Sequence, residues 1–151
     1  MIDIAHKHLD GYRYKLNGPN LDNLETNCCI ATEQIMMEYF GAKFTREEHR
    51  DLMILDAARP WSPIDAVVSA GIGIAVDKPI PGRYHMMQRW RSTDPLECGH
   101  SLIYFEAPTP DPDGCLVIQA TYDMNSAFLK VHDIAAASRG YEYRIALLNE
   151  R

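Results

Sequence analysis

The sequence predicts an α+β fold in which helices from the first half of the chain pack against one mostly antiparallel sheet from the second half. Two observations support this prediction. Between residues 28 and 70, apolar residues recur at helical spacing behind capping signals, whereas from residue 72 onward short β-branched and aromatic runs alternate with turns. With 151 residues, of which 46% are hydrophobic and 24% charged, the chain is expected to form a single domain over residues 1–151.

The strongest helix signal covers residues 28–40. Asn27 is a favourable N-cap residue, and Gly41 is a favourable residue for closing the helix. Apolar side chains occur on more than one face of this helix, which is typical of a helix buried inside a domain. We therefore expect the helix to lie beneath the sheet.

The other elements follow from capping signals and from strand-like runs. A capping box at residues 45–48 opens one helix, and a proline at the first position opens another. The polar stretch 1–22 is expected to be an irregular N-terminal arm with a short strand at 12–16. The remaining predicted elements are helices from Thr45 to about Ala58, from Ser62 to before Gly71 and at about 131–138, and strands at 72–76, 84–90, 101–106, 116–121 and 141–148.

Charge and hydropathy restrict the partners and the location. The formal net charge is -6 without a basic run, so we expect neither nucleic acid nor a membrane as a partner. No apolar stretch is long enough for a membrane span, and the start of the chain is too charged for a secretory signal. We expect the protein to be cytoplasmic where it is made, and export without a cleavable signal is compatible with this sequence.

The cysteines do not follow a metal-binding pattern. Cys28 and Cys29 are adjacent, and Cys98 with His100 forms a half-site without a second half at a usual spacing. We therefore predict no metal and no other cofactor, and a metal-binding protein that uses Cys98 and His100 is a weaker hypothesis.

Two cysteines lie where a reactive thiol is expected. Cys28 and Cys29 occupy the first turn of the predicted helix, where unpaired backbone N–H groups and the helix dipole stabilise a thiolate. On a helical wheel the turn below Cys28 is suited to burial, whereas Cys29 stands above Glu33, which is expected to face water. The wheel favours Cys28 as the nucleophile and leaves Cys29 as the alternative.

A histidine follows at the start of a predicted core strand. His100 comes after Gly99 and precedes an apolar run, so a rigid element would hold its ring at the open end of the sheet, as a general base requires. A third residue usually orients such an imidazole. The neighbouring predicted strand offers Gln119, which the spacing slightly favours, and Asp123.

The catalytic hypothesis also needs a donor for the developing oxyanion, a few residues before the nucleophile. Asn23 is the best candidate by position, and Asn20 and the backbone N–H of the nucleophile are the alternatives.

These segments together resemble a known family. The run from Asn27 to Gly41, NCCIATEQIMMEYFG, is similar to the start of bacteriocin-processing peptidases that cleave double-glycine leaders, where an acidic residue, the catalytic cysteine and a glycine precede an apolar helix that ends in two aromatic residues and glycine. Residues 44–52 resemble the second helix of that family, and Gly99-His100 matches its catalytic histidine segment. The resemblance implies a papain-like fold, a buried N-terminal helix that carries nucleophile Cys28, and a sheet that carries His100.

Three departures from that family pattern affect the choice of activity. Cys29 replaces the glycine, Asp22 stands where a glutamine is expected, and the Asp-Pro of the later strand is missing near Gln119. A Cys–His–Gln set is similar to that of bacterial glutamine deamidase effectors of the same fold. Aligning Cys29 with papain instead places Asn23 at the oxyanion position.

The expected function is therefore a cysteine-dependent amide hydrolase, either a protease, an amidase or a glutamine deamidase, that forms a thioester with a protein or peptide substrate. A bacterial effector or toxin is compatible with the small size of the chain. The alternative is a papain-like fold that has lost catalysis and acts as a binding or regulatory module, which Asp22 and the missing Asp-Pro favour.

Overall fold

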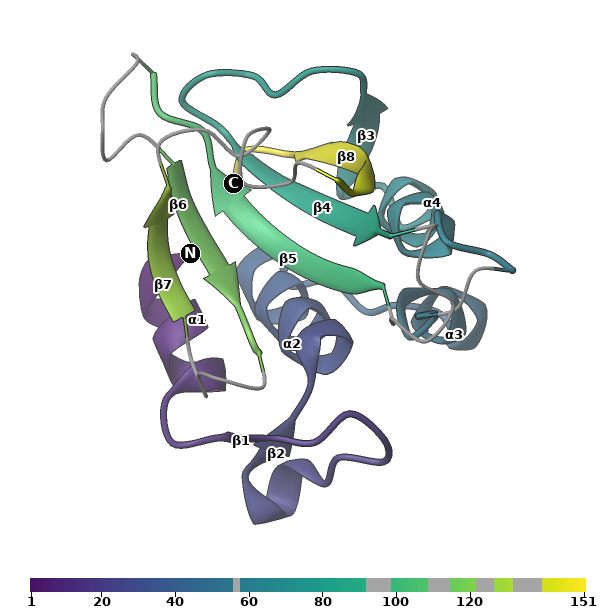
Figure 1. Ribbon diagram of the computed structural model, residues 1–151, viewed down its shortest axis with the longest axis vertical. Coiled ribbons are helices and arrows are strands. Elements are labelled where there is room, and N and C mark those ends of the chain that lie inside the picture. The colour runs from purple at the N-terminus through teal and green to yellow at the C-terminus, as the bar shows by residue number, and fades with distance from the viewer. Residues whose placement is uncertain (56–57, 92–98, 109–114, 122–126, 132–139) are drawn as a thin grey trace.

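The computed structural model describes residues 1–55, 58–91, 99–108, 115–121, 127–131 and 140–151. Helices pack on an antiparallel six-stranded sheet with the order β3-β8-β4-β5-β6-β7 (Figure 1), which confirms the α+β prediction. The elements are α1 (Ile2–Leu9), β1 (Arg13–Tyr14), the 3-10 helix η1 (Leu21–Asn23), β2 (Glu25–Thr26), α2 (Cys28–Phe40), α3 (Arg46–Leu52), α4 (Ser62–Ser69), β3 (Gly73–Val76), β4 (Tyr84–Trp90), β5 (His100–Phe105), β6 (Cys115–Gln119), β7 (Ala127–Val131) and β8 (Glu142–Leu148).

The sheet is built mainly from neighbours in sequence. Strands β4 to β7 form a meander, and the last strand, β8, returns to pair with both β3 and β4. This return places β4 and β5 in the middle of the sheet. Strand β5 begins at the same end of the sheet at which β6 finishes, so the first residue of one and the last residue of the other can meet.

Helix α2 has the predicted bounds, and its start is held by two hydrogen bonds of one side chain. Asn27 Oδ1 accepts from the Ile30 N–H at 2.8 Å, which is the N-cap interaction, and Asn27 Nδ2 donates to the Leu16 carbonyl at 3.0 Å. At the other end Gly41 has a φ of 61°, the left-handed conformation that glycine adopts at low cost. The first turn is therefore fixed to the segment that precedes β2.

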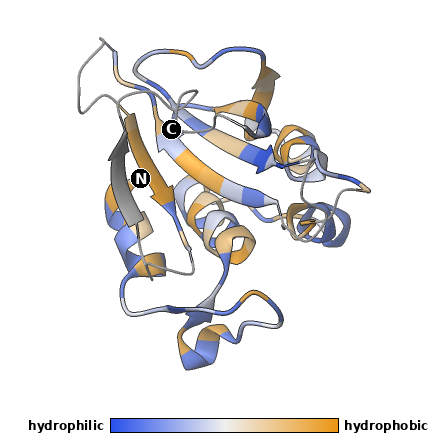
Figure 2. Cartoon of the chain, viewed as in Figure 1, coloured by the Kyte–Doolittle hydropathy of each residue, from blue (hydrophilic) through white to orange (hydrophobic). Residues whose placement is uncertain are grey.

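The helices bury one face of the sheet. Helix α2 contacts β5 and β6, and α4 contacts β3, β4 and β8, while α1 packs on α2 and α3 packs on α4. Figure 2 shows apolar residues along β6, in parts of β5 and β8, and in patches on α2 and α4. The fully buried residues Ile35 and Met36 of α2 meet Met86, Ile103 and Ile118 of the sheet in one core.

The opposite face of the central strands is also buried. Tyr104 and Leu102 of β5 pack there with Met87 of β4, with Val117 of β6 and with Ile145 of β8. Strands that are buried on both faces rarely unfold locally. The ends of β5 and β6 can therefore hold side chains in fixed positions.

The N-terminal arm contains a helix that the sequence did not predict. Residues 2–9 form α1, whereas the expected short strand is reduced to β1, which pairs with β2 in a two-residue parallel ribbon. Ala5 and Leu9 are fully buried, and Lys7 and His8 bond to Glu38 of α2 at 2.8 and 2.7 Å. The helix is eight residues long and depends on these contacts with α2, which local sequence does not encode.

Two other boundaries differ from the prediction. Helix α3 has the predicted Thr45 capping box but ends at Leu52, because the chain turns to bring the Leu55 carbonyl to the Gly99 N–H at 3.3 Å. Strand β7 was not predicted, and Val131 ends this strand rather than starting a helix. The rest of the last predicted helix lies outside the described residues.

The double role of Asn27 leads to a stability prediction. Replacing Asn27 with Ala removes both the cap and the bond to Leu16, so we expect the free energy of unfolding to fall by about 1–2 kcal/mol, measured by urea titration. Asn27→Ser is the matched control, because it keeps a cap acceptor and loses only the donor to Leu16. If both variants lose the same free energy of unfolding, the N-cap bond is not the larger of the two contributions.

Candidate active site

Three of the predicted residues meet at the first turn of α2. Cys28 is the first residue of α2, His100 is the first residue of β5, and Gln119 is the last residue of β6. The Asn27 side chain already satisfies the Ile30 N–H, and the N–H groups of Cys28 and Cys29 lie in the helical turn that has no internal acceptors. Cys28 therefore belongs to the turn at the positive end of the α2 dipole.

The register of the sheet places Gln119 next to His100. Ile103 pairs with Ile118, so continuing the ladder by one residue sets Gln119 opposite Leu102, two positions from His100 on the same face. Gln119 Oε1 lies 2.7 Å from His100 Nε2. Because an amide oxygen can only accept, Nε2 carries the proton, and Nδ1 is the ring nitrogen left for the Cys28 thiol.

The surroundings of Cys28 favour its thiolate. The neighbouring Cys29 thiol is the largest influence that lowers the pKa of Cys28. Burial opposes it, and the hydrogen bond with the His100 ring, the charge that this ring gains with a second proton, and the Ser101 backbone lower the pKa further. Cys28 is only 1% exposed, so its charge is stabilised by these groups rather than by water. This arrangement fits a nucleophile activated by a base.

Cys29 is the opposite case. Its pKa is raised, first by the interaction with Cys28 and then by burial. Its sulfur lies 4.0 Å from the Cys28 sulfur and 3.8 Å from Ser101 Oγ, so its proton has two acceptors within reach. Ser101 donates its own proton to Gln88 Oε1 at 2.5 Å, which leaves the Ser101 oxygen as an acceptor. Cys29 is thereby held as a neutral thiol.

The helical wheel gave the wrong environment for Glu33. This side chain is 3% exposed rather than facing water, and His49 of α3 bonds to its carboxylate at 2.6 Å. Burial raises the pKa of Glu33 and the His49 contact opposes this rise. The helix is therefore buried at this turn below Cys29 as well, and the influence of His100, which lowers the pKa of Cys28, distinguishes the two cysteines.

The predicted oxyanion donors do not reach the thiol. Asn23 is exposed at the end of η1, which Figure 1 shows beyond β1 and β2 and away from the first turn of α2. Asn20 uses its Oδ1 to cap η1, accepting from the Asp22 N–H at 3.0 Å. Of the predicted donors, only the backbone N–H of the nucleophile lies at the site. Asp123, the alternative to Gln119, lies outside the described residues.

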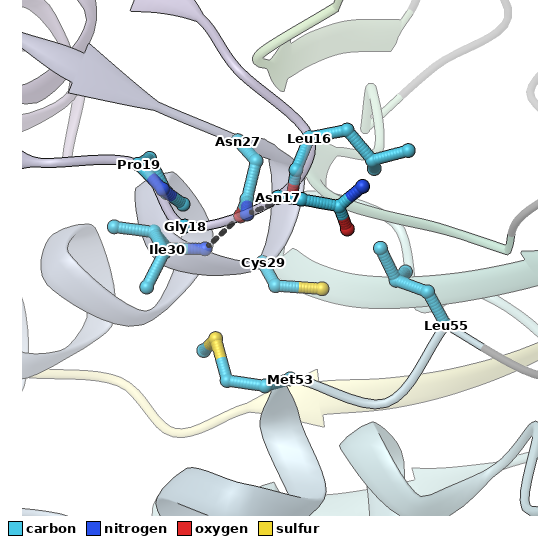
Figure 3. A pocket seen from close by; sticks show the side chains of 9 residues that line it. All are labelled: Leu16, Asn17, Gly18, Pro19, Asn27, Cys29, Ile30, Met53 and Leu55. Carbon is cyan, nitrogen blue, oxygen red and sulfur yellow. Dashed lines mark hydrogen bonds between the residues drawn. The ribbon is translucent and has the colours of Figure 1, made fainter.

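A pocket opens beside Cys29, the neighbour of Cys28 in the chain (Figure 3). Its volume is about 340 Å³, and the Cys29 sulfur points into the space between Asn17, Met53 and Leu55. Asn17 is exposed at the rim, and its amide makes no hydrogen bond within the described part of the chain. The complete lining is Leu16, Asn17, Gly18, Pro19, Asn27, Cys29, Ile30, Met53 and Leu55.

Gly99 has a structural role that the sequence alone did not indicate. A Cβ atom on Gly99 would lie 2.4 Å from Trp90 Cε3 and 2.8 Å from Gln88 Nε2, so only glycine allows the chain to pass over these two side chains. Trp90 and Gln88 come from β4, which pairs with β5 through Arg89 and His100. This packing fixes the backbone immediately before His100.

Sequence reasoning missed three residues that lie around the candidate site, Asn17, Gln88 and Ser101. Asn17 belongs to a turn-forming run, Asn17-Gly18-Pro19-Asn20, and Gln88 and Ser101 lie inside apolar strands. A polar side chain in a buried strand position is the one signal that could have found Gln88 and Ser101, because such a group needs a buried partner.

Four other histidines have partners away from the site. His6 bonds to Asp10, His8 bonds to Glu38, and His49 bonds to Glu33. His85 is fully buried beside the Tyr104 ring, and burial lowers its pKa to about 4, so it is neutral at physiological pH. His132 lies outside the described residues.

Comparison with known protein families, curated proteins and solved structures finds no significant match. Over the described ranges, no group of three or more His, Cys, Asp or Glu side chains could hold a metal ion. The Cys98 half-site lies outside those ranges. Within them, no helix has both the length and the apolar character that crossing a membrane requires.

The close approach at Gly99 leads to a second prediction. Gly99→Ala forces either β5 or Trp90 to move, so we expect a loss of about 1–3 kcal/mol in the free energy of unfolding, measured by urea titration. In a Trp90→Leu background the same glycine substitution should cost much less, because the contacting ring atoms are gone. If the losses of unfolding free energy of the two single variants simply add in the double variant, the contact between position 99 and Trp90 is not the cause of the loss.

Proposed function

We propose that this protein is a cysteine-dependent amide hydrolase of papain-like architecture. Cys28 is the nucleophile, His100 the general base and acid, and Gln119 the residue that orients the imidazole. The observation that carries the proposal is the His100 ring, which lowers the pKa of Cys28 and which Gln119 orients through the 2.7 Å bond at Nε2. A helix-start thiol and an oriented imidazole form the pair that acyl transfer needs.

The reaction follows from these positions. His100 takes the thiol proton at Nδ1, and the Cys28 thiolate attacks the carbonyl carbon of an amide, forming a C–S bond. The C–N bond then breaks while His100 returns the proton to the leaving nitrogen, which departs as an amine or as ammonia. Water attacks the thioester with His100 as base, the C–S bond breaks, and a carboxylic acid and the Cys28 thiol are released.

The backbone N–H groups in the first turn of α2 are the oxyanion donors in this scheme. They are fixed by the Asn27 cap and they lie beside the attacking sulfur. Peptide bonds and glutamine side-chain amides both have the required carbonyl, so the same residues serve a protease, an amidase or a glutamine deamidase. A protein or peptide is the proposed substrate.

A second candidate function is a binding or regulatory module on this fold without catalysis. It is favoured by the burial of both thiols, which are 1% and 2% exposed. The two candidates predict different chemistry for Cys28, and thiol reactivity separates them.

The reactivity of Cys28 is the third prediction. Because its pKa is lowered, Cys28 should remain a thiolate at a pH at which ordinary thiols are protonated, and iodoacetamide should alkylate it at least about tenfold faster than Cys29 or Cys115 at pH 7. The measurement is mass spectrometry of peptides after timed labelling across a range of pH. His100→Ala should move the inflection of the Cys28 profile to higher pH.

Cys28→Ser and Cys29→Ser provide the matched controls for this experiment, and equal rates at all thiols would favour the binding module. Turnover is measured on a peptide library for cleavage and on glutamine-containing peptides for released ammonia. Loss of turnover in Cys28→Ser with turnover retained in Cys29→Ser is the expected result, and the reverse result would assign the nucleophile to Cys29.

The role of Gln119 is the fourth prediction. Gln119→Leu removes the acceptor for the His100 Nε2–H, so the tautomer with Nδ1 free is no longer selected, and alkylation of Cys28 at neutral pH should slow by up to about a hundredfold. Gln119→Glu keeps an acceptor at this position and should retain most of the rate. If the leucine variant has the wild-type pH profile for Cys28, Gln119 does not position the base.

A further inference from the structure

The pocket beside Cys29 is placed to receive part of the substrate. Its wall includes the Cys29 side chain, whose sulfur is 4.0 Å from the Cys28 sulfur. In the proposed reaction the acyl group of the substrate becomes attached to Cys28 through a C–S bond. The acyl group on Cys28 would then be attached one thiol away from the pocket, whose lining includes Cys29 but not Cys28.

The walls of the pocket define what it can hold. Leu16, Ile30, Met53 and Leu55 contribute apolar surface, and no charged side chain lines the pocket among the described residues. Asn27 belongs to the lining, but its amide is already bonded to the Ile30 N–H and the Leu16 carbonyl. A charged group that entered this space would lose water without gaining a partner of opposite charge.

The size of the pocket points to one or two side chains. A volume of about 340 Å³ is near the lower end of the range for small-molecule sites, which is roughly 300–1,000 Å³. The exposed Asn17 amide at the rim offers both a donor and an acceptor to the peptide group of a bound substrate. Apolar walls with one polar group at the mouth are suited to an apolar amino-acid residue (Figure 3).

We propose that this pocket binds an apolar side chain of leucine or methionine size on the acyl side of the amide that Cys28 attacks, with Asn17 hydrogen-bonded to the backbone of that residue. The inference rests on the proposed function, because it takes Cys28 as the nucleophile. It makes the enzyme selective for apolar residues next to the bond that is broken.

The test uses N-acylated aminoacyl chloromethyl ketones, which place a chosen side chain on the acyl side of the carbon that reacts with the thiol. The probes are the leucyl, alanyl, lysyl and glutamyl compounds, and the full chain is used. For each probe the rate of Cys28 alkylation is measured by mass spectrometry and divided by the rate with iodoacetamide. We expect the normalised alkylation rate of the leucyl probe to be about tenfold or more above the rates of the lysyl and glutamyl probes. It should be several-fold above the rate of the alanyl probe.

A pair of charged variants tests the wall directly. Leu55→Glu should shift the normalised preference toward the lysyl probe, and Leu55→Lys should shift it toward the glutamyl probe, because each new charge faces the pocket. Asn17→Ala should reduce the rates with all four chloromethyl ketones relative to the rate with iodoacetamide. Circular dichroism of each variant verifies folding, and the probe series on the unmodified chain remains a test if a variant does not fold.

The outcomes separate the two proposals. Selective alkylation of Cys28 by iodoacetamide with equal normalised rates for all four probes would overturn the pocket assignment and leave the hydrolase proposal standing. An unreactive Cys28 would overturn the hydrolase proposal, and the pocket assignment with it. A leucyl preference that neither Leu55 variant changes would place the binding of the apolar residue elsewhere.

Discussion

The packing of the first turn of α2 against the beginning of β5 is the contact on which the candidate site depends. A helix terminus provides unpaired N–H groups but does not by itself provide a base, and a strand end can hold a histidine but does not by itself provide a nucleophile. The two come together because the cap of α2 is tied to Leu16 on one side, and because Gly99 lets β5 pass closely over Trp90 on the other. Both anchors are buried, so the position of the Cys28 sulfur relative to the His100 ring is set by the core rather than by surface loops.

The sequence predicted the parts of this arrangement that have local signals. Asn27 and Gly41 determined the bounds of α2, and the change from glycine to an apolar run marked His100 as the start of a strand. The interactions that it could not predict are those between side chains far apart in the chain. The buried Glu33 carboxylate is bonded to His49 of another helix, and α1 is held on α2 by the bonds from Lys7 and His8 to Glu38. For the same reason Asn23 was a reasonable donor by spacing alone, yet the β1–β2 ribbon carries η1 away from the thiol.

Sheet register explains why Gln119 could be chosen while its role needed the structure. Residues two apart on paired strands share a face, so a polar residue near the end of the next strand had a good chance of reaching His100. The sequence does not give the pairing of Ile103 with Ile118, and a shift by one residue would have turned the Gln119 side chain to the other face. The 2.7 Å contact depends on this register, and so does the tautomer in which Nε2 carries the proton and Nδ1 is unprotonated.

The second cysteine is part of the electrostatics of the site rather than a spare nucleophile. Two thiols 4.0 Å apart in a buried site cannot both lose their protons without strong repulsion, so stabilising one thiolate requires that the other stay protonated. The His100 ring and the Ser101 backbone lower the pKa of Cys28, whereas Cys29 faces the Ser101 hydroxyl oxygen, which is left as an acceptor because its proton goes to Gln88. The buried Ser101–Gln88 pair therefore favours a protonated Cys29, and Cys29 in turn stabilises the anion on Cys28. With glycine at position 29, only the helix dipole, His100 and the Ser101 backbone would stabilise the Cys28 thiolate.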